Sequence, residues 1–277
     1  MKLENENILN KIGHVVSLDK MLDTDINTLH PLSGDDLLDI DTSIHKIRKS
    51  LKSISAILYL YEFQFDHSEF LNLKFNIKSL SKHTAFLREN FVYLQVFNKI
   101  EDELNAIDKS DLVELRNQFE SKYNLMLPGN IVNEETIEKG NEAIFKITDA
   151  IQKLHINSER KLLKRRLSKN YQKTQKLYKK LNLHSSSEQY HQFRKWCKRF
   201  YFQKTAFKRL GLEKTSKQNK KLYKLTEYLG NEHDLQLFYH YISVHFTKLS
   251  KLTLSFFKRK TNNLRKKILE LYPEINY

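Results

Sequence analysis

Residues that break regular structure are unusually scarce in this chain. Its 277 residues include only six glycines and three prolines. Tight turns between strands rely on both types, because glycine reaches backbone conformations that other residues avoid and proline fixes its own. So few breakers over such a length favour long helices joined by few loops. The sequence therefore predicts an all-α fold.

Hydrophobic periodicity supports helices along the whole chain. From Ile44 onward, apolar residues recur at spacings of three or four, which places them on one face of a helix. Thr42 or Ser43 is the expected N-cap of this helix. Further helices are expected over residues 68–82, 83–107, 110–123, 134–155, 158–182, 187–210, 216–229, 232–248 and 250–270.

Turn signals and charge suggest how the chain is organised. The clearest break is Leu127-Pro128-Gly129-Asn130, and a second loop, Asn182–Ser187, ends in a serine cap. Residues 1–40 carry eight acidic and three basic residues, and we expect this extension to pack on the rest of the protein. The predicted division is an acidic extension over 1–40 and a domain over 41–277, with halves at about 41–127 and 130–277.

The formal net charge of +15 indicates a polyanionic partner. A field of this size attracts nucleic acid, an anionic membrane surface or inorganic polyphosphate, and it does not choose among them. The charge is unevenly placed, since residues 153–180 hold eleven Lys or Arg and one acid. We therefore expect a molecule with one strongly basic surface.

The setting predicted for this chain is cytoplasmic. Cys197 is the single cysteine, which excludes an intramolecular disulfide and a cysteine-rich zinc site. The first residues carry acids and amides where a signal peptide needs an apolar core. The sequence contains no run of 18 apolar residues, so we predict no membrane span.

A short basic motif occurs twice. His45-Lys-Ile-Arg48-Lys49-Ser-Leu-Lys52 and His191-Gln-Phe-Arg194-Lys195-Trp-Cys-Lys198 both fit H-x-[IF]-R-K-x-x-K, and they lie 146 residues apart. About 43 residues after each histidine a second motif follows, Arg88-Glu89 in the first half and His233-Asp234 in the second. Two related helical units about a pseudo-twofold axis would explain this repeat.

Each basic motif forms one face of a helix. Side chains at positions 0, 3, 4 and 7 point the same way, so a histidine and three cations stand together without an acid among them. Like charges at these spacings destabilise a helix by a few tenths of a kcal/mol per pair. The alternative is a solvated face whose cations meet acids elsewhere in the fold, but the repetition with histidine at the same place favours a binding site. Imidazole can donate an N–H to a phosphate oxygen.

These motifs resemble those of the CHAD domain, the conserved-histidine α-helical family. The family has an H-x-x-R motif with further basic residues once per half, as in His45/Arg48 and His191/Arg194. It also has L-G-x-x-x-D-L, and this chain has Leu229-Gly230-Asn-Glu-His-Asp234-Leu235. The first-half counterpart, Leu87-Arg88-Glu89-Asn90, has Glu where Asp is usual. The resemblance covers about residues 40–270.

The resemblance implies two pseudo-symmetric four-helix bundles around a central basic groove that binds inorganic polyphosphate. Carried over by matching position, the groove would contain His45, Arg48, Lys49, Lys52, His191, Arg194, Lys195, Lys198 and Arg199, with Arg88 joining them. Glu89 and Asp234 would orient a neighbouring Arg or His by charge-assisted hydrogen bonds. Lysine stands where the family often has arginine at positions 49 and 52, and Ser53 falls where a further arginine is common. Lysine binds phosphate without arginine's bidentate fork, so this departure bears on affinity in the first half more than on the mode of binding.

The basic stretch 158–182 has two interpretations. Its first turns could extend the groove, as the equivalent helix does in the family, and for this role we favour Arg160, Lys164 and Arg165. Alternatively, the lysines further along are a solvated helix end. The same two interpretations apply to the C-terminal runs Lys258-Arg259-Lys260 and Arg265-Lys266-Lys267. Adjacent residues point in different directions on a helix, so only part of each run can face one ligand.

Binding is favoured over catalysis, and no cofactor is called for. The histidine spacings do not match a helical zinc motif, the chain has no P-loop, and the basic faces lack metal-binding carboxylates. The sequence thus predicts a non-enzymatic polyphosphate-binding protein, with association with polyphosphate granules as a further implication. A nucleic-acid-binding protein is the second hypothesis, with Trp196, Tyr201 and Phe202 as candidate stacking residues that core packing explains better. A scaffold for an acidic partner protein is the third.

Overall fold

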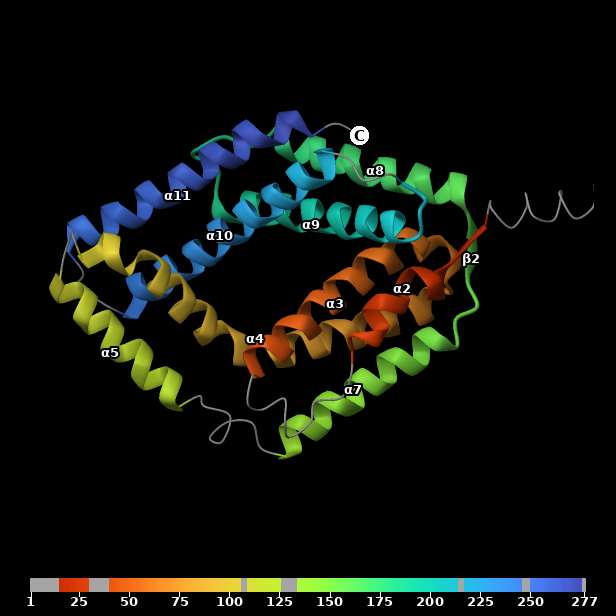
Figure 1. Cartoon of the computed structure of the whole chain (residues 1–277), viewed down its shortest axis with the longest axis horizontal. Helices are drawn as coiled ribbons and strands as arrows, with labels where there is room; N and C mark the ends of the chain where they lie inside the picture. The colour runs from red at the N-terminus through yellow and green to blue at the C-terminus, as the bar shows by residue number, and fades with distance from the viewer. Residues whose placement is uncertain are drawn as a thin grey trace, which may run out of the picture.

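The structure is a computed structural model that describes residues 15–29, 40–105, 109–125, 134–213, 217–245 and 250–275. Within these ranges the chain is mostly helical (Figure 1). The elements are, in order, β1 (Val15–Ser17), α2 (Leu18–Asn27), α3 (Ile40–Tyr61), η2 (Glu62–Gln64), α4 (His67–Asn105), α5 (Lys109–Leu125), α7 (Glu134–Gln152), β2 (Asn157–Glu159), α8 (Arg160–Tyr178), α9 (Ser187–Arg209), α10 (Lys217–His245), α11 (Lys251–Leu271) and η3 (Tyr272–Glu274). None of the described helices is long and apolar enough to cross a membrane.

Two helices are longer than predicted. α4 is continuous over the stretches expected at 68–82 and 83–107, and α10 is continuous over those expected at 216–229 and 232–248. Gly230 lies inside α10 and does not break it. Glycine costs a helix interior about 1 kcal/mol relative to alanine, and packing of α10 on α9, α11 and α4 outweighs that preference here.

The helix caps were predicted with mixed success. α3 begins at Ile40, so the proposed N-caps Thr42 and Ser43 lie inside its first turn and that prediction was wrong. Ser43 is buried, and packing extends the helix one turn upstream of the expected cap. The serine cap at the second loop is confirmed, because Ser186 and Gln189 form a reciprocal capping box at the start of α9. The turn at 127–130 lies outside the described residues.

A short antiparallel ribbon was not predicted. β1 pairs with β2, with Val15 opposite Glu159 and Ser17 opposite Asn157. The sequence of β2 is polar and carries no alternating apolar pattern, so no strand signal was present. The ribbon fixes the start of α2 beside the start of α8, which Figure 1 shows at one end of the molecule.

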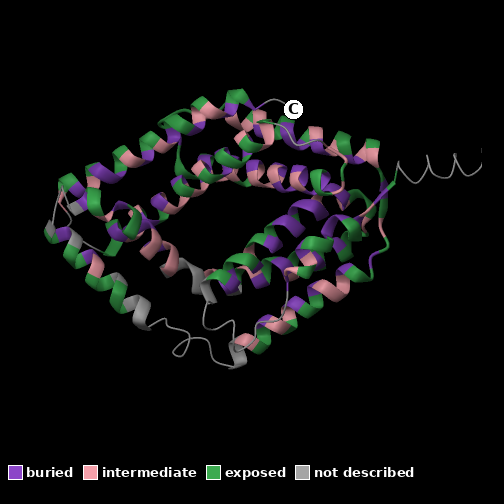
Figure 2. Ribbon diagram, in the orientation of Figure 1, coloured by how far each residue is buried: buried purple, intermediate pink, exposed green. Residues whose placement is uncertain are grey.

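Two hydrophobic clusters form the core. The larger one joins α2, α3, the first part of α4, α7, α8 and α9, together with parts of α10 and α11. The smaller one lies between the second part of α4, α5, the second part of α10 and the first part of α11. Buried positions recur along α3 with exposed positions between them, and along α9 with mostly intermediate positions between them (Figure 2). The larger cluster therefore connects residues from both predicted halves of the chain.

The described part of the acidic extension packs on the domain. Leu18, Met21 and Leu22 of α2 are buried in the larger cluster. Asp25 is buried as well, and its Oδ2 accepts hydrogen bonds from Ser53 Oγ at 2.8 Å and Arg209 Nη2 at 2.7 Å. Ser53 thus faces α2 and anchors it, at the position where the family often has arginine.

Replacing Asp25 by alanine is expected to destabilise the protein by about 2–3 kcal/mol, because it leaves a serine and an arginine without their charged acceptor. Urea unfolding of Asp25→Ala measures this change. Asp23→Ala on the exposed side of α2 is the control, with an expected change within about 0.5 kcal/mol. Equal effects of the two variants would contradict the packing described for α2.

Candidate anion-binding site

Packing of α3 against α9 brings the two basic motifs together. Lys52 of α3 lies within electrostatic reach of Arg194 and Lys198 of α9, residues more than 140 positions later in the chain. His191 of α9 and His233 of α10 complete the group. We call Lys52, His191, Arg194, Lys198 and His233 the basic cluster.

Both lysines of the basic cluster titrate far below their usual range. Reduced hydration within the fold lowers the pKa of Lys52 to about 7, and the charges of Lys198, Arg194 and Arg48 add to this effect, although part of the side chain is exposed to solvent. The pKa of Lys198 falls to about 8, first through desolvation and then through Arg194. The cations are therefore crowded enough to oppose each other's charge.

The rings of two histidines lie tilted against each other beside these cations. The ring centroids of His191 and His233 are 5.0 Å apart with an interplanar angle of 42°. Desolvation, then Arg194 and His191, lower the pKa of His233 to about 3. Desolvation and Arg194 also lower the pKa of His191. Both imidazoles are neutral at pH 7, so each can donate one N–H and accept one hydrogen bond.

Arg194 is the member of the cluster with an unmet hydrogen-bonding group. Its Nε is buried and has no hydrogen-bond partner among the described residues. Burial lowers the pKa of its guanidinium, while Asp234 and Glu232 raise it. Asp234 also favours the charged forms of Lys52 and Lys198, so it stands near all three cations. Its role as an orienting acid stays a prediction.

A buried ion pair that was not predicted fixes the helices around the cluster. Arg265 of α11 donates from Nε to Glu232 Oε1 of α10 at 2.9 Å, and from Nη1 to Ser185 O at 2.8 Å. Its guanidinium also lies over the ring of Tyr190, 4.3 Å from the centroid. Desolvation raises the pKa of Glu232 despite Arg265. This arrangement ties α11, α10 and the start of α9 to each other.

The remaining first-half residues lie on the exposed side of α3 or bond to α4. Arg48 donates from Nη1 to Ser81 O at 2.6 Å and to Thr84 Oγ1 at 3.2 Å. His45 and Lys49 are exposed on α3, and Lys195 is exposed on α9. The side chains of Arg88 and Glu89 lie outside the described residues, although α4 continues through them.

Arg199 is held in an aromatic clamp. Its guanidinium lies 4.0 Å from the ring centroid of Tyr59 on α3 and 4.4 Å from that of Trp196. Burial lowers its pKa, and Tyr59 and Glu62 oppose that effect. This contact joins α9 to α3. Lys198 lies on a different side of α9, beside Gly230 of α10.

The first turns of α8 lie far from the basic cluster. α8 runs antiparallel to α9, because Asn170 bonds Gln203 whereas Tyr178 packs on Phe193. Arg160 accordingly bonds Leu212 O beyond the end of α9. The distance along α8 from Arg160 to Tyr178, which lies near the cluster, is about 27 Å at 1.5 Å per residue.

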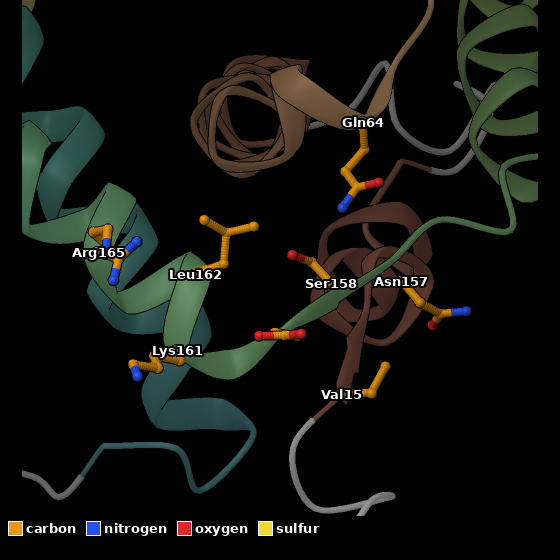
Figure 3. A pocket seen from close by; sticks show the side chains of 8 residues that line it. Val15, Gln64, Asn157, Ser158, Lys161, Leu162 and Arg165 are labelled. Carbon is orange, nitrogen blue, oxygen red and sulfur yellow. The ribbon is translucent and has the colours of Figure 1, made fainter.

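The structure therefore does not bring Arg160, Lys164 and Arg165 to the cluster. Lys164 and Arg165 are exposed. Arg165 instead lines a pocket with Lys161, beside Ser158 of β2 and Gln64 of η2 (Figure 3). The sequence could not tell the direction of α8 relative to α9, which decides which of its cations reach the cluster.

Two residues of the site were missed in the sequence. His233 and Glu232 both lie within the motif Leu229–Leu235, between the glycine and the aspartate. A histidine adjacent to the aspartate was visible as a signal, but its meeting with His191 depends on how α10 packs on α9. Nothing in the sequence paired Glu232 with Arg265.

The fold and the cluster define a mostly helical protein in which paired basic helices meet. A sequence profile described as the CHAD domain matches residues 32–242, and this chain belongs to that family. Among solved structures, PptA from Streptomyces chartreusis is similar in fold, with a TM-score of 0.63 over 92% of this chain and 96% of that chain at 10% sequence identity. No curated protein sequence matches the chain. The likeness at this identity shows the fold alone.

The depressed lysine pKa values predict how stability depends on pH. Unfolded lysines bind protons up to about pH 10.4, whereas Lys52 and Lys198 lose theirs near 7 and 8 in the folded protein. The unfolded state therefore binds more protons above about pH 7, and stability rises with pH.

Urea unfolding between about pH 7 and pH 9.5 is expected to show this rise, and the double variant Lys52→Met/Lys198→Met is expected to flatten it. Lys169→Met, on the exposed side of α8, should keep the slope of the original protein. If the unfolding free energy of the double variant still rises with pH as in the original protein, the two lysines do not cause the rise. That result would contradict the charge repulsion described for the cluster.

Proposed function

We propose that this protein binds inorganic polyphosphate, without catalysis, at the basic cluster. The observation that carries the proposal is the meeting of Lys52 with Arg194 and Lys198, because it places cations from both repeated motifs at one point. Fixed cations that repel one another form a site whose energy falls when an anion binds. The buried Nε of Arg194 offers a further donor to such a ligand.

An elongated polyanion suits the arrangement better than a single phosphate. Basic residues continue along α3 beyond the cluster to Lys49 and His45, and Lys195 adds an exposed cation within the stretch of α9 that the cluster spans. We propose that these residues flank a groove between the two related halves and contact successive phosphates of one chain. Arg48 would act by positioning, since it is bonded to α4.

Binding without catalysis fits the state of the nearby acids. Hydrolysis of phosphoanhydrides generally needs metal ions held by carboxylates. Glu232 is already paired with Arg265, and Asp234 stands among several cations. Association with polyphosphate granules in the cytoplasm is the cellular role that this proposal implies.

Nucleic acid is the weaker candidate for the cluster itself. Single-stranded nucleic acid binds best where bases can stack on aromatic rings. Trp196, two residues after Arg194 in the sequence, has Arg199 over its ring and Tyr59 in edge contact with it. Phe202 is buried. Neither of these two rings is therefore free to stack on a base beside the cations of the cluster.

Titration of labelled polyphosphate at several salt concentrations tests the proposal, with single-stranded RNA at equal phosphate concentration as competitor. Arg194→Gln should weaken polyphosphate binding by about tenfold or more, because a charged hydrogen bond contributes about 1.5–3 kcal/mol. Arg165→Gln is the same change at a residue about 20 Å along α8 from Tyr178. It should leave affinity within about twofold, as expected for a contact that contributes little.

The proposal predicts that polyphosphate wins the competition and that affinity falls with salt. Equal losses in Arg194→Gln and Arg165→Gln would indicate a nonspecific basic surface and contradict the proposal. Preference for RNA would favour the nucleic-acid hypothesis instead.

Binding should also take up protons. A bound polyanion raises the pKa values of Lys52 and Lys198 from about 7 and 8 toward the ordinary lysine range. Affinity for polyphosphate is therefore highest below about pH 7, where the lysines are protonated before binding. It falls as pH rises above this value, up to the pH at which the lysines lose their protons in the complex as well. Calorimetry in buffers of different ionisation enthalpy at about pH 8 measures the proton uptake. Binding that is independent of pH over this range would contradict a role for the two lysines.

A further inference from the structure

The contact between α9 and α10 continues from the basic cluster into a pocket. Lys198 Nζ lies 3.9 Å from the position that a Cβ at Gly230 would take. Further along, Glu227 of α10 acts electrostatically on both Lys198 and Tyr201. The rings of Tyr201 and Tyr223 follow at 5.8 Å between centroids. The basic cluster and the tyrosine pair therefore lie along one contact line between antiparallel helices.

The pocket at this tyrosine pair has the size and lining of a small-molecule site. Its volume is about 450 Å³, within the range of about 300–1,000 Å³ that ligand pockets occupy. Its lining consists of Tyr201, Lys204, Thr205, Lys208, Asn219, Lys220, Leu222 and Tyr223. Aromatic rings, lysines and a side-chain amide are thus gathered in one cavity.

The outer tyrosine is placed for stacking rather than for core packing. Tyr223 is 50% exposed, although its ring contacts that of Tyr201. A core aromatic buries most of its surface, whereas a ring left half in water at a pocket offers a face to a planar ligand. Stacking of a nucleobase on such a ring is tolerant of sequence and favourable.

A polar group in the pocket complements a base. Oδ1 of Asn219 is buried and has no hydrogen-bond partner among the described residues, so it can accept from an exocyclic amine. Lys204 is paired with Glu213 at 3.0 Å. Lys208 and Lys220 are exposed at the pocket, further from Lys198 along their helices than the tyrosine pair is.

We propose that this pocket binds the base of a purine nucleoside polyphosphate, whose phosphate chain extends along α9 and α10 to Lys198 and Arg194. From Tyr223 to Gly230, which lies beside Lys198, the distance along α10 is about 10 Å, a span suited to a short phosphate chain. The proposal rests on the proposed function for its phosphate end. It adds a base-recognition site formed by Tyr223 and Asn219.

The experiment compares adenosine triphosphate with inorganic tripolyphosphate in magnesium-free buffer at fixed ionic strength. Both ligands carry three phosphates, so a base pocket is needed for the nucleotide to bind more tightly. The expected preference for adenosine triphosphate is about fivefold or more, as one stacked base contributes. Tyr223→Ala should abolish the preference and leave tripolyphosphate binding unchanged, whereas Tyr223→Phe should keep it.

Phe75→Ala is the matched control, because Phe75 is an aromatic residue of α4 that is 70% exposed, and it should keep the preference. Thermal unfolding of each variant confirms that it is folded. Equal affinity for the two ligands, or a preference that survives Tyr223→Ala, would overturn the pocket while leaving polyphosphate binding intact. Failure of long polyphosphate itself to bind would overturn the proposed function as well.

Discussion

Apolar packing of α3 on α9 is the constraint on which the site depends. The stripe that includes Ile47, Leu51 and Ile54 is buried in the same cluster as Phe193 and Phe200. Burial of such side chains contributes about 1.5–3 kcal/mol each, more than the few tenths of a kcal/mol by which neighbouring like charges on a helix repel each other. The hydrophobic faces therefore hold the basic faces together.

Polar contacts around this packing set the direction of each helix. Arg199 between Tyr59 and Trp196 fastens α9 to α3, and Arg265 with Glu232 fastens α11 to α10. A buried pair of this kind is costly to break, because the partner left behind is a charge without compensation. Arg265 is already paired with Glu232 and Arg199 lies between two rings, whereas the buried Nε of Arg194 has no hydrogen-bond partner among the described residues.

Much of the fold followed from composition and repetition, and the arrangement of the helices did not. Scarce glycine and proline predicted the helices, and the repeated motif pointed to Lys52, Arg194 and Lys198 as one group. The sequence analysis divided α4 and α10 into two helices each, whereas both are continuous and packing carries α10 through Gly230. It could not orient α8 against α9, so Arg160 was placed with a group from which it lies far away. Contacts between distant elements, such as His191 with His233, have no local signature.

The most direct test of the account is the structure of the protein in complex with tripolyphosphate. The account predicts phosphate oxygens within hydrogen-bonding distance of Arg194 Nε, with Lys52 and Lys198 on either side of the same chain. Phosphate bound at the first turns of α8, beside Lys161 and Arg165, with the basic cluster unchanged, would contradict it. That result would mean that the repeated motifs meet without forming the binding site.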